Sequence, residues 1–381
     1  MNRPFSNEEL RRYSRHLMLP QIGEAGQLKL KSGSVIVVGA GGLGSPAAMY
    51  LAAAGVGRIG LVDFDRVDES NLQRQVLYRT ADFARKKVAV AAETLRAMNP
   101  HVEIQPYDVR LGAGNALEIF RNYDLVVDGS DNFSTRYLAN DAAALMKKPY
   151  VYGSVFRFEG QASVFWAGRG PCYRCIFPEP PPPESAPNCA EAGVLGVLPG
   201  IIGLVQATEA IKILLGIGEP LLGRMLLYDA LAMRFRELRV RRDPKCALCG
   251  DAPTITELTE YSLCCAMPVQ PAKETAMNEI TVEELKTAID TKKAICLVDV
   301  REQKEFDLCR IPTSRLIPLG EIPARFGELD RNADIVMHCK AGGRSAKACE
   351  FLAAQGFKKV RNLKGGILAW ADRIDPSVPK Y

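Results

Sequence analysis

The sequence lacks an excess of charge of either sign, an apolar N-terminal segment and an uninterrupted apolar run. Its 49 lysine and arginine residues nearly balance 44 aspartate and glutamate residues, which leaves a net charge of +5. So small an excess favours neither a nucleic acid nor a membrane surface as a partner. The polar N-terminus leads into a charged helix predicted over residues 6–30, which is not typical of a signal peptide. The most apolar stretch, residues 194–215, contains glycines, Gln206, Glu209 and Lys212, so we expect no membrane span.

The eleven cysteines are an odd number, and we expect no secretory signal. A full set of disulfides is therefore not expected. Such usage is typical of metal ligands and reactive thiols and predicts a reducing cytoplasm. A chain of 381 residues is long for one domain, so we expect two.

A glycine turn lies at the centre of the N-terminal half. A β-branched run over residues 35–38 predicts a strand, Gly-Ala-Gly-Gly-Leu-Gly at residues 39–44 predicts a tight turn, and residues 46–54 predict a helix. In this order the backbone N–H groups and the positive end of the helix face a bound phosphate. An ordinary NAD(P) site has the same order, so the glycine spacing leaves both a dinucleotide and ATP open.

Charged residues behind the glycine turn separate these alternatives. Asp63 ends the next predicted strand, where an acid takes ribose hydroxyls. Arg74 and Lys87 follow, and hydride transfer needs neither, whereas attack on the α-phosphate of ATP builds charge that they can neutralise. Asp131 follows another buried strand, a natural place for a Mg²⁺ ligand. Taken singly, Arg74 and Lys87 are equally typical of solvated surface charges, and Asp131 of a helix N-cap.

Four segments resemble the adenylation core of the MoeB/ThiF family, relatives of ubiquitin-activating enzymes: residues 39–44, 61–65, 70–75 and 131–132. The resemblance covers about residues 5–250 and implies a Rossmann-like α/β adenylation domain. It implies contacts to ATP and Mg²⁺ from Gly42, Asp63, Ser70, Asn71, Leu72, Gln73, Arg74, Lys87, Asp131 and Asn132.

The same resemblance implies a homodimer in which Arg15 reaches into the partner's nucleotide site. The chain departs from the family at residues 84–87. Relatives usually have Gly-x-Pro-Lys there, and this chain has Ala-Arg-Lys-Lys. Lys87 stays aligned with the family lysine, and Lys86 is the alternative.

Two C-x-x-C pairs predict a metal site. Cys172 and Cys175 form the first pair, and Cys246 and Cys249 form the second. Four thiolates from two turns suit tetrahedral Zn²⁺ and leave no open position, so the metal is expected to be structural. One such pair by itself is also typical of a redox motif.

A proline-rich segment over residues 177–189 separates the two pairs and ends at Cys189. So many prolines predict an extended, exposed loop. Cys189 is either incidental or placed on an arm that visits an acyl-adenylate. In the MoeB/ThiF family the matching cysteine, followed by Ala-Glu-Ala-Gly as here, is implicated in thioester or disulfide chemistry.

A linker is expected over residues 251–277, between a first domain at residues 1–250 and a smaller α/β domain at residues 278–381. In the second domain a buried strand runs into Cys339 and the loop Lys-Ala-Gly-Gly-Arg-Ser, followed by a helix. Backbone N–H groups, the helix terminus and Arg344 favour a thiolate there and would hold an anionic persulfide. His338 is expected to face the core or to position the loop.

This loop resembles the active loop of rhodaneses, as do Asp-Val-Arg-Glu at residues 299–302 and Gly-Gly-Ile-Leu-Ala-Trp at residues 365–370. Where that family usually has Gly-His-Ile-Pro-Gly-Ala, this chain has Cys-Arg-Ile-Pro-Thr-Ser at residues 309–314. A phosphatase-like loop is the rival, but the spacing from Cys339 to Arg344 is one residue shorter than a phosphatase needs. Sulfur therefore fits better than phosphate.

Together the two centres predict sulfur-carrier activation. ATP and Mg²⁺ would serve to adenylate a ubiquitin-like sulfur carrier ending in Gly-Gly. A Cys339 persulfide, loaded from thiosulfate or a cysteine desulfurase, would then replace the adenylate and yield a thiocarboxylate for molybdopterin, thiamin, tRNA thiolation, cysteine or secondary-metabolite pathways. Two alternatives stay open at this point: an NAD(P)-linked oxidoreductase fused to a rhodanese, and a non-catalytic scaffold that binds a carrier.

Overall fold

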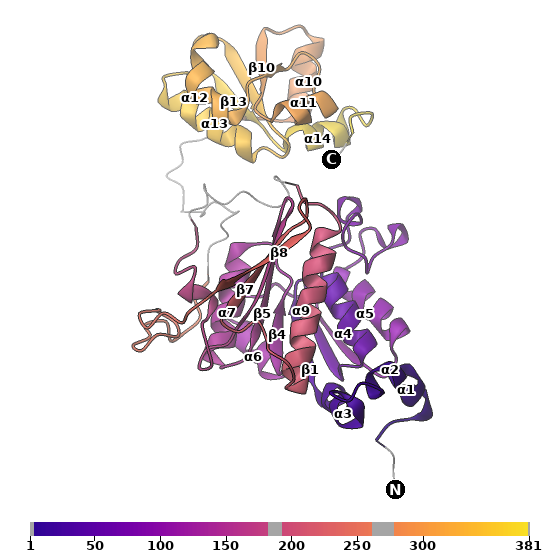
Figure 1. The fold of residues 1–381 in the computed structure, drawn as a ribbon. Coiled ribbons are helices and arrows are strands. Elements are labelled where there is room, and N and C mark those ends of the chain that lie inside the picture. The colour runs from indigo at the N-terminus through magenta and orange to yellow at the C-terminus, as the bar shows by residue number, and fades with distance from the viewer. Residues whose placement is uncertain (1–3, 182–192, 261–277, 380–381) are drawn as a thin grey trace. The chain divides into compact units, whose positions relative to one another are not determined.

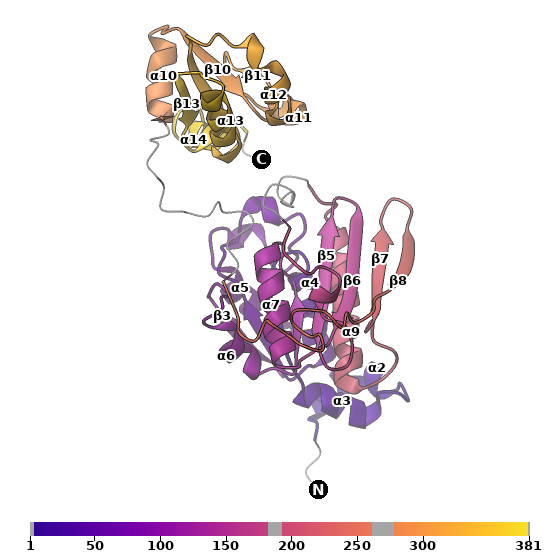
Figure 2. The same ribbon diagram turned by 90° about the vertical axis from the view of Figure 1, so that its left-hand side faces the viewer.

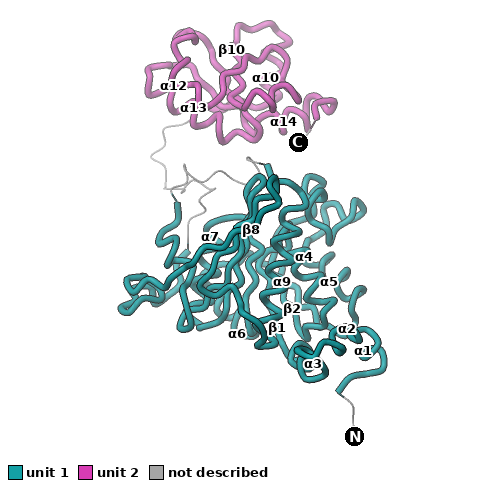
Figure 3. Tube along the Cα trace, viewed as in Figure 1, with its two compact units in different colours: residues 1–268 teal, residues 269–381 magenta. Residues whose placement is uncertain are grey.

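The computed structural model describes residues 4–181, 193–260 and 278–379. The chain divides into two compact units, residues 1–268 and residues 269–381 (Figure 3). Each unit holds its own sheet with helices packed against it, so both have the expected α/β class.

The first unit is built on an eight-stranded sheet in the order β3-β2-β1-β4-β5-β6-β7-β8 (Figures 1 and 2). Neighbours from β3 through to β5 pair in parallel, and those from β5 to β8 pair antiparallel. The strands are β1 (Ser34–Val38), β2 (Arg58–Val62), β3 (Glu103–Tyr107), β4 (Leu125–Asp128), β5 (Tyr150–Phe156), β6 (Glu159–Phe165), β7 (Arg224–Asp229) and β8 (Arg234–Arg239).

The helices of this unit are α1 (Asn7–Arg12), α2 (Ser14–Leu17), α3 (Gly23–Ser32), α4 (Gly44–Ala54), α5 (Lys87–Met98), α6 (Ala116–Arg121), α7 (Phe133–Leu145) and α9 (Leu198–Leu215). The prediction of one helix over residues 6–30 is wrong, because α1 to α3 replace it. Tyr13 leaves helical geometry at ψ 9° and is buried, where its hydroxyl accepts a hydrogen bond from Asn99. Pro20 lies between α2 and α3, where its ring cannot continue a helix.

The glycine turn joins β1 to α4 as predicted. All of β1 is buried, and the chain leaves it through Gly39, whose φ of +87° belongs to the left-handed region. At Gly44 a side chain is excluded, because a Cβ would lie 1.9 Å from the carbonyl oxygen of Gly39. Glycine is therefore required both to turn the chain and to let the helix start close to the strand end.

By length and composition alone, α9 passes the test for a membrane span, with a mean hydropathy of 1.5, contrary to the expectation from sequence. Half of that window is buried inside the unit, however. Its Gln206 donates to the carbonyl oxygens of Asp128 and Val151, and its Glu209 accepts from the Leu221 N–H. These buried hydrogen bonds to the sheet and its flanking loop are typical of a core helix.

The second unit is built on a five-stranded parallel sheet in the order β11-β10-β12-β13-β9. The strands are β9 (Glu279–Ile280), β10 (Ile295–Asp299), β11 (Arg315–Leu316), β12 (Asp334–His338) and β13 (Val360–Leu363). The helices are α10 (Val282–Asp290), α11 (Gln303–Leu308), α12 (Ile322–Arg325), α13 (Gly343–Ala354) and α14 (Gly366–Arg373).

Candidate functional site

A cavity of about 220 Å³ lies at the carboxyl ends of β1, β2 and β4 in the first unit. Because these strands pair in parallel, the residues that follow them meet at one edge of the sheet. Of the residues predicted to bind ATP and Mg²⁺, the cavity is lined by Gly42, Asp63, Arg74, Lys87, Asp131 and Asn132. The fold thus gathers residues spread over about ninety positions of sequence, and their roles stay predictions.

Asp63 is fixed at the end of β2 by two backbone N–H groups. Its carboxylate accepts from Ala40 and from Asp65, both at 2.9 Å. Burial raises the pKa of Asp63, and Lys87 and these two hydrogen bonds oppose the rise. The side chain is therefore oriented before any ligand enters, as a carboxylate that accepts from ribose hydroxyls needs to be.

The two neighbouring lysines at the start of α5 differ in their surroundings. Lys87 is 5% exposed, lines the cavity and lies 3.0 Å from the Asp65 carboxylate. Lys86 is more exposed, pairs with Asp108 at 3.1 Å and donates to the carbonyl oxygen of Phe64. Of these two lysines, Lys87 lines the cavity and Lys86 does not.

Asp131 is not the N-cap of α7, because the next residue takes that position. The Asn132 side chain accepts from the Thr135 N–H at 2.9 Å and from the Ser134 hydroxyl at 3.0 Å. Asp131 lies at the cavity with an exposed carboxylate. Asp128, the other acid of this strand end, is fully buried and accepts from the Tyr150 hydroxyl. Asp131 is therefore the carboxylate at this strand end that can hold a cation.

Five residues predicted to bind the nucleotide lie outside the lining of the cavity: Arg15, Ser70, Asn71, Leu72 and Gln73. The last four surround a 3-10 turn in which the Ser70 carbonyl oxygen accepts from the Arg74 guanidinium at 3.0 Å. This turn holds Arg74 at the cavity. Arg15 is exposed on α2, away from the cavity of its own chain.

The cavity also contains two side chains that the sequence analysis did not select. Gln75 is 5% exposed, and its Oε1 atom has no hydrogen-bond partner among the described residues. Arg136 is 6% exposed, and its Nε atom lies 3.4 Å from the Asp128 carboxylate. Gln75 directly follows Arg74 in the same polar segment, a signal that was present in the sequence. Arg136 lies one helical turn after Asn132, but its burial has no sequence signal.

The two C-x-x-C pairs converge on one point. The sulfur atoms of Cys172, Cys175, Cys246 and Cys249 all lie within 4.8 Å of one another. Three of the sulfur–sulfur distances are 3.4, 3.6 and 4.0 Å. A tetrahedral Zn²⁺ with Zn–S bonds of about 2.3 Å separates its sulfurs by about 3.8 Å. The four side chains therefore fit zinc in their present positions.

The electrostatics of this cluster also favour a cation. Hydrogen bonds among the sulfurs raise the pKa of Cys172 and lower that of Cys175, so without a cation the cluster shares protons and does not hold four thiolates. Four thiolates at these distances are stable only around a positive charge. Leu248 and the side chains of α7 surround the cluster, which suits a closed structural site.

In the second unit, Cys339 follows β12 and is 2% exposed. Its sulfur accepts from the Gly342 N–H at 3.2 Å and from the Ser345 hydroxyl at 3.4 Å. Gly342, with φ of +104°, is the N-cap of α13. The predicted thiol cradle is therefore present: the sulfur lies among N–H and hydroxyl donors beside a helix N-terminus, a place that suits a bound anion.

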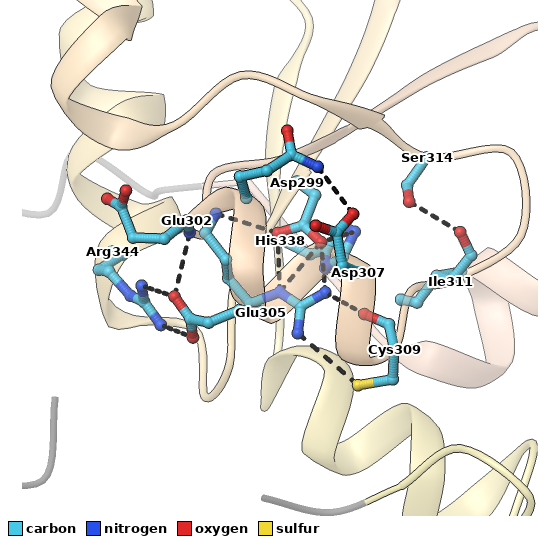
Figure 4. A network of polar contacts seen from close by, with 11 residues as sticks. Asp299, Glu302, Glu305, Asp307, Cys309, Ile311, Ser314, His338 and Arg344 are labelled. Carbon is cyan, nitrogen blue, oxygen red and sulfur yellow. Dashed lines mark hydrogen bonds and ion pairs between the residues drawn. The ribbon is translucent and has the colours of Figure 1, made fainter. Parts of the chain in front are cut away.

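Arg344 was predicted to add a fixed positive charge to this cradle, and its guanidinium has a carboxylate partner. It pairs with Glu305 of α11 through two hydrogen bonds of 2.7 and 2.8 Å (Figure 4). The same Glu305 carboxylate accepts from the Glu302 N–H at 3.0 Å and so belongs to the cap of α11. Much of the charge of Arg344 is therefore neutralised within the protein.

His338 faces the core, as expected. It is fully buried, its Nε2 atom lies 3.7 Å from the Asp299 carboxylate, and burial lowers its pKa to about 4. Asp299 pairs with the fully buried Arg301, which donates to the Cys309 carbonyl oxygen at 2.7 Å. The ring is therefore neutral near pH 7, and Figure 4 shows it beside Asp299.

Residues 309–314 differ from the usual rhodanese sequence and include one residue with a left-handed backbone conformation. Thr313, which stands where rhodaneses usually have glycine, has φ of +70°. A β-branched residue in the left-handed region costs on the order of 1–2 kcal/mol, which the surrounding fold must offset. Cys189, the remaining predicted site residue, lies outside the described residues.

Comparison with known proteins identifies a family for each of the two units. The ThiF family model matches residues 13–248, and the model of the rhodanese-like domain matches residues 281–373. A Mycobacterium tuberculosis protein described as a probable adenylyltransferase/sulfurtransferase, MoeZ, is 48% identical over 99% of this chain and 96% of its own length. The adenylyltransferase and sulfurtransferase MOCS3 of Bos taurus is 44% identical over 99% of this chain and 88% of its own length.

A Thermus thermophilus sulfur carrier protein adenylyltransferase is 57% identical over 69% of this chain and 99% of its own length. Among solved structures, Escherichia coli MccB has a TM-score of 0.57 at 21% identity, over 68% of this chain and 76% of that chain. At this identity the likeness shows the fold alone. The names of the relatives favour an adenylyltransferase and sulfurtransferase over the two alternatives, an oxidoreductase or a scaffold.

Proposed function

Because the chain belongs to the ThiF family and carries a rhodanese-like domain behind it, we propose that it converts the C-terminal glycine of a ubiquitin-like sulfur carrier protein into a thiocarboxylate. The observation that carries the proposal is that one chain holds both a cationic cavity beside a glycine turn and a cysteine in an anion cradle. The first activates a carboxylate, and the second presents sulfur to it.

In the first step the carrier carboxylate attacks the α-phosphorus of ATP, an acyl-adenylate forms and pyrophosphate leaves. Arg74 and Lys87 line the cavity and stabilise the charge that builds on the phosphate. Asp63 accepts from the ribose hydroxyls. Asp131 would hold Mg²⁺, which supplies further neutralisation of the phosphates.

In the second step the terminal sulfur of a Cys339 persulfide attacks the acyl carbon, and AMP leaves. A thiolate, from Cys189 or from an external thiol, then attacks the Cys339 sulfur of the acyl disulfide. The carrier thiocarboxylate departs, and a disulfide between Cys339 and that thiol remains for an external dithiol to reduce. The thiols of these steps need reducing surroundings, so we place the reaction in the cytoplasm.

We propose that the carrier binds to an exposed apolar surface at the antiparallel end of the first sheet. Near the β5–β6 and β7–β8 turns it comprises Phe156, Phe158, Leu231, Met233 and Phe235, each at least 37% exposed. Phe156 and Val155 end the same strand, and Val155 lines the cavity, so this end of β5 is shared by the nucleotide site and the apolar surface. A carrier bound there would have its C-terminus close to the α-phosphate.

A homodimer fits the position of Arg15. Its side chain is exposed beside Met18 and Leu19, which are 72% and 47% exposed. An apolar patch of this kind next to an arginine suits contact with a second copy. In such a dimer Arg15 would complete the partner's nucleotide site.

The test is to incubate the full chain with a carrier ending in Gly-Gly, ATP and thiosulfate, and to weigh the carrier. We expect it to gain the mass difference between sulfur and oxygen. Cys339→Ser abolishes the gain and leaves ATP–pyrophosphate exchange intact, whereas Cys296→Ser, a half-buried thiol of the same unit, changes neither. An unchanged carrier mass with the wild-type chain, or a full gain with Cys339→Ser, refutes the proposal.

A further inference from the structure

The guanidinium nearest in sequence to the Cys339 cradle is paired inside the protein. Arg344 lies between Gly343 and Ser345 in the first turn of α13, and Ser345 is itself in contact with the Cys339 sulfur. Its guanidinium forms two hydrogen bonds with Glu305, in a pair whose side chains are 23% and 14% exposed. Two parallel hydrogen bonds between charged groups that are mostly shielded from water form a strong pair.

An anionic sulfur donor needs a cation at this place. Thiosulfate carries two negative charges, and loading the cradle brings it close to a thiolate that is negative as well. The Gly342 N–H and the helix terminus supply only partial positive charges, so the full charges of this loop are those of Lys340 and Arg344. A guanidinium binds such an oxyanion through two hydrogen bonds, but the Glu305 carboxylate already takes that geometry.

We propose that Glu305 is a specificity-determining residue that disfavours anionic sulfane donors by pairing with Arg344. The proposal rests on the proposed function, because it concerns how the Cys339 persulfide is loaded. Glu305 competes with the donor's oxyanion for the same guanidinium. Donors with fewer negative charges lose less from this competition than thiosulfate does.

The loading step is balanced without another reactant. The Cys339 thiolate attacks the sulfane sulfur of thiosulfate, a Cys339 S–S bond forms, the S–S bond of thiosulfate breaks, and sulfite leaves with the electron pair. The persulfide keeps one negative charge. Cyanide then removes the outer sulfur as thiocyanate and returns the thiolate, which makes the step measurable in solution.

Glu305→Gln in the full chain is the test, because it keeps the size of the side chain and an oxygen acceptor for the Glu302 N–H. The matched control is Glu302→Gln, which removes the same charge from the exposed cap of the same helix. Thiocyanate formation is followed with thiosulfate, a dianion, and with methanethiosulfonate, a monoanion that also carries a sulfane sulfur.

We expect Glu305→Gln to lower the KM for thiosulfate about tenfold, which is the effect of freeing one charged hydrogen-bond pair. The KM for methanethiosulfonate falls by a smaller factor, and kcat stays within about twofold because the thiol cradle is untouched. Glu302→Gln changes neither KM. In an Arg344→Gln background, Glu305→Gln has no further effect, since the guanidinium that it frees is gone.

Three outcomes overturn the proposal: unchanged KM values in Glu305→Gln, an equal fall for both donors, or a fall that persists in the Arg344→Gln background. A rise in the KM for thiosulfate also overturns it, because Glu305 would then hold Arg344 in place for the donor. Failure of the wild-type chain to form thiocyanate at all is a different result. That outcome removes the sulfurtransferase function itself.

Discussion

Replacing Lys87 and Lys86 by glutamine, one at a time, separates a cation that acts on the nucleotide from one that does not. The two residues are adjacent in sequence, and each pairs with a carboxylate at 3.0 to 3.1 Å. Lys87 is buried at the cavity, whereas Lys86 has a side chain that is 36% exposed and a partner that is 45% exposed. The same chemical change is therefore made at two positions that differ in their surroundings.

The expected magnitudes differ by more than a factor of ten. A preorganised charge that meets the transition state in a shielded cavity is worth about 3–4 kcal/mol, or about 10²- to 10³-fold in rate. An exposed ion pair such as Lys86–Asp108 contributes about 0–1 kcal/mol to stability. Even if all of this energy were lost from the transition state, the rate would change only a fewfold. Lys87→Gln also leaves Asp63 without the positive charge that now opposes the rise of its pKa.

The assay is ATP–pyrophosphate exchange in the presence of the carrier, with thermal unfolding as the check that both variants fold. We expect Lys87→Gln to lower kcat/KM for ATP at least a hundredfold and Lys86→Gln to change it less than threefold. Equal losses in the two variants, or a folded Lys87→Gln variant that keeps more than a third of the wild-type rate, would refute the assignment of Lys87 to the α-phosphate.

Three further predictions concern other parts of the chain. Cys246→Ser removes one predicted zinc ligand, so metal analysis should find one zinc per chain in the wild type and less than one in the variant, whose first unit should unfold at a lower temperature. Gln75→Glu places a negative charge beside the phosphate-binding turn and should raise the KM for ATP about tenfold in the exchange assay, whereas Gln75→Met should raise it less. His338 binds its proton with a pKa of about 4 when folded and about 6.5 when unfolded, so protons favour the unfolded state between these values. The free energy of unfolding of the second unit should therefore fall as the pH drops from 7 to 4, and in denaturant titrations His338→Gln should lose this part of the dependence.

The sequence predicted the positions of the site residues where parallel-sheet geometry alone determines them. Asp63 and Asp131 each follow a buried strand, and such strand ends meet at one edge, so the carboxylates gather there. The convergence of the cysteine pairs was likewise predictable, because two C-x-x-C turns that share a metal must approach one another.

Local patterns failed where tertiary contacts decide the backbone. The helix predicted over residues 6–30 is broken twice: at Pro20, which is visible in the sequence, and at Tyr13, which is buried next to Gly55, where a Cβ would lie 2.5 Å from the tyrosine ring. Helical periodicity carries no trace of that contact. Thr313 is the opposite case, because its turn has a geometry that its own side chain disfavours.

The partners of charged side chains were the least predictable feature from the sequence. The nucleotide cavity and the Cys339 loop differ in how exposed the carboxylate partner of their cation is. Lys87 lines the cavity beside the glycine turn, Arg344 follows the Cys339 loop, and each pairs with a carboxylate, Asp65 or Glu305. The Asp65 side chain is 52% exposed, so an entering phosphate can take Lys87 while water solvates the displaced carboxylate. The Glu305 side chain is only 14% exposed and also caps α11, so its displacement would leave a carboxylate poorly hydrated. If Lys87 meets the nucleotide and Arg344 lies beside the donor, as we propose, the same kind of ion pair leaves Lys87 available and withholds Arg344.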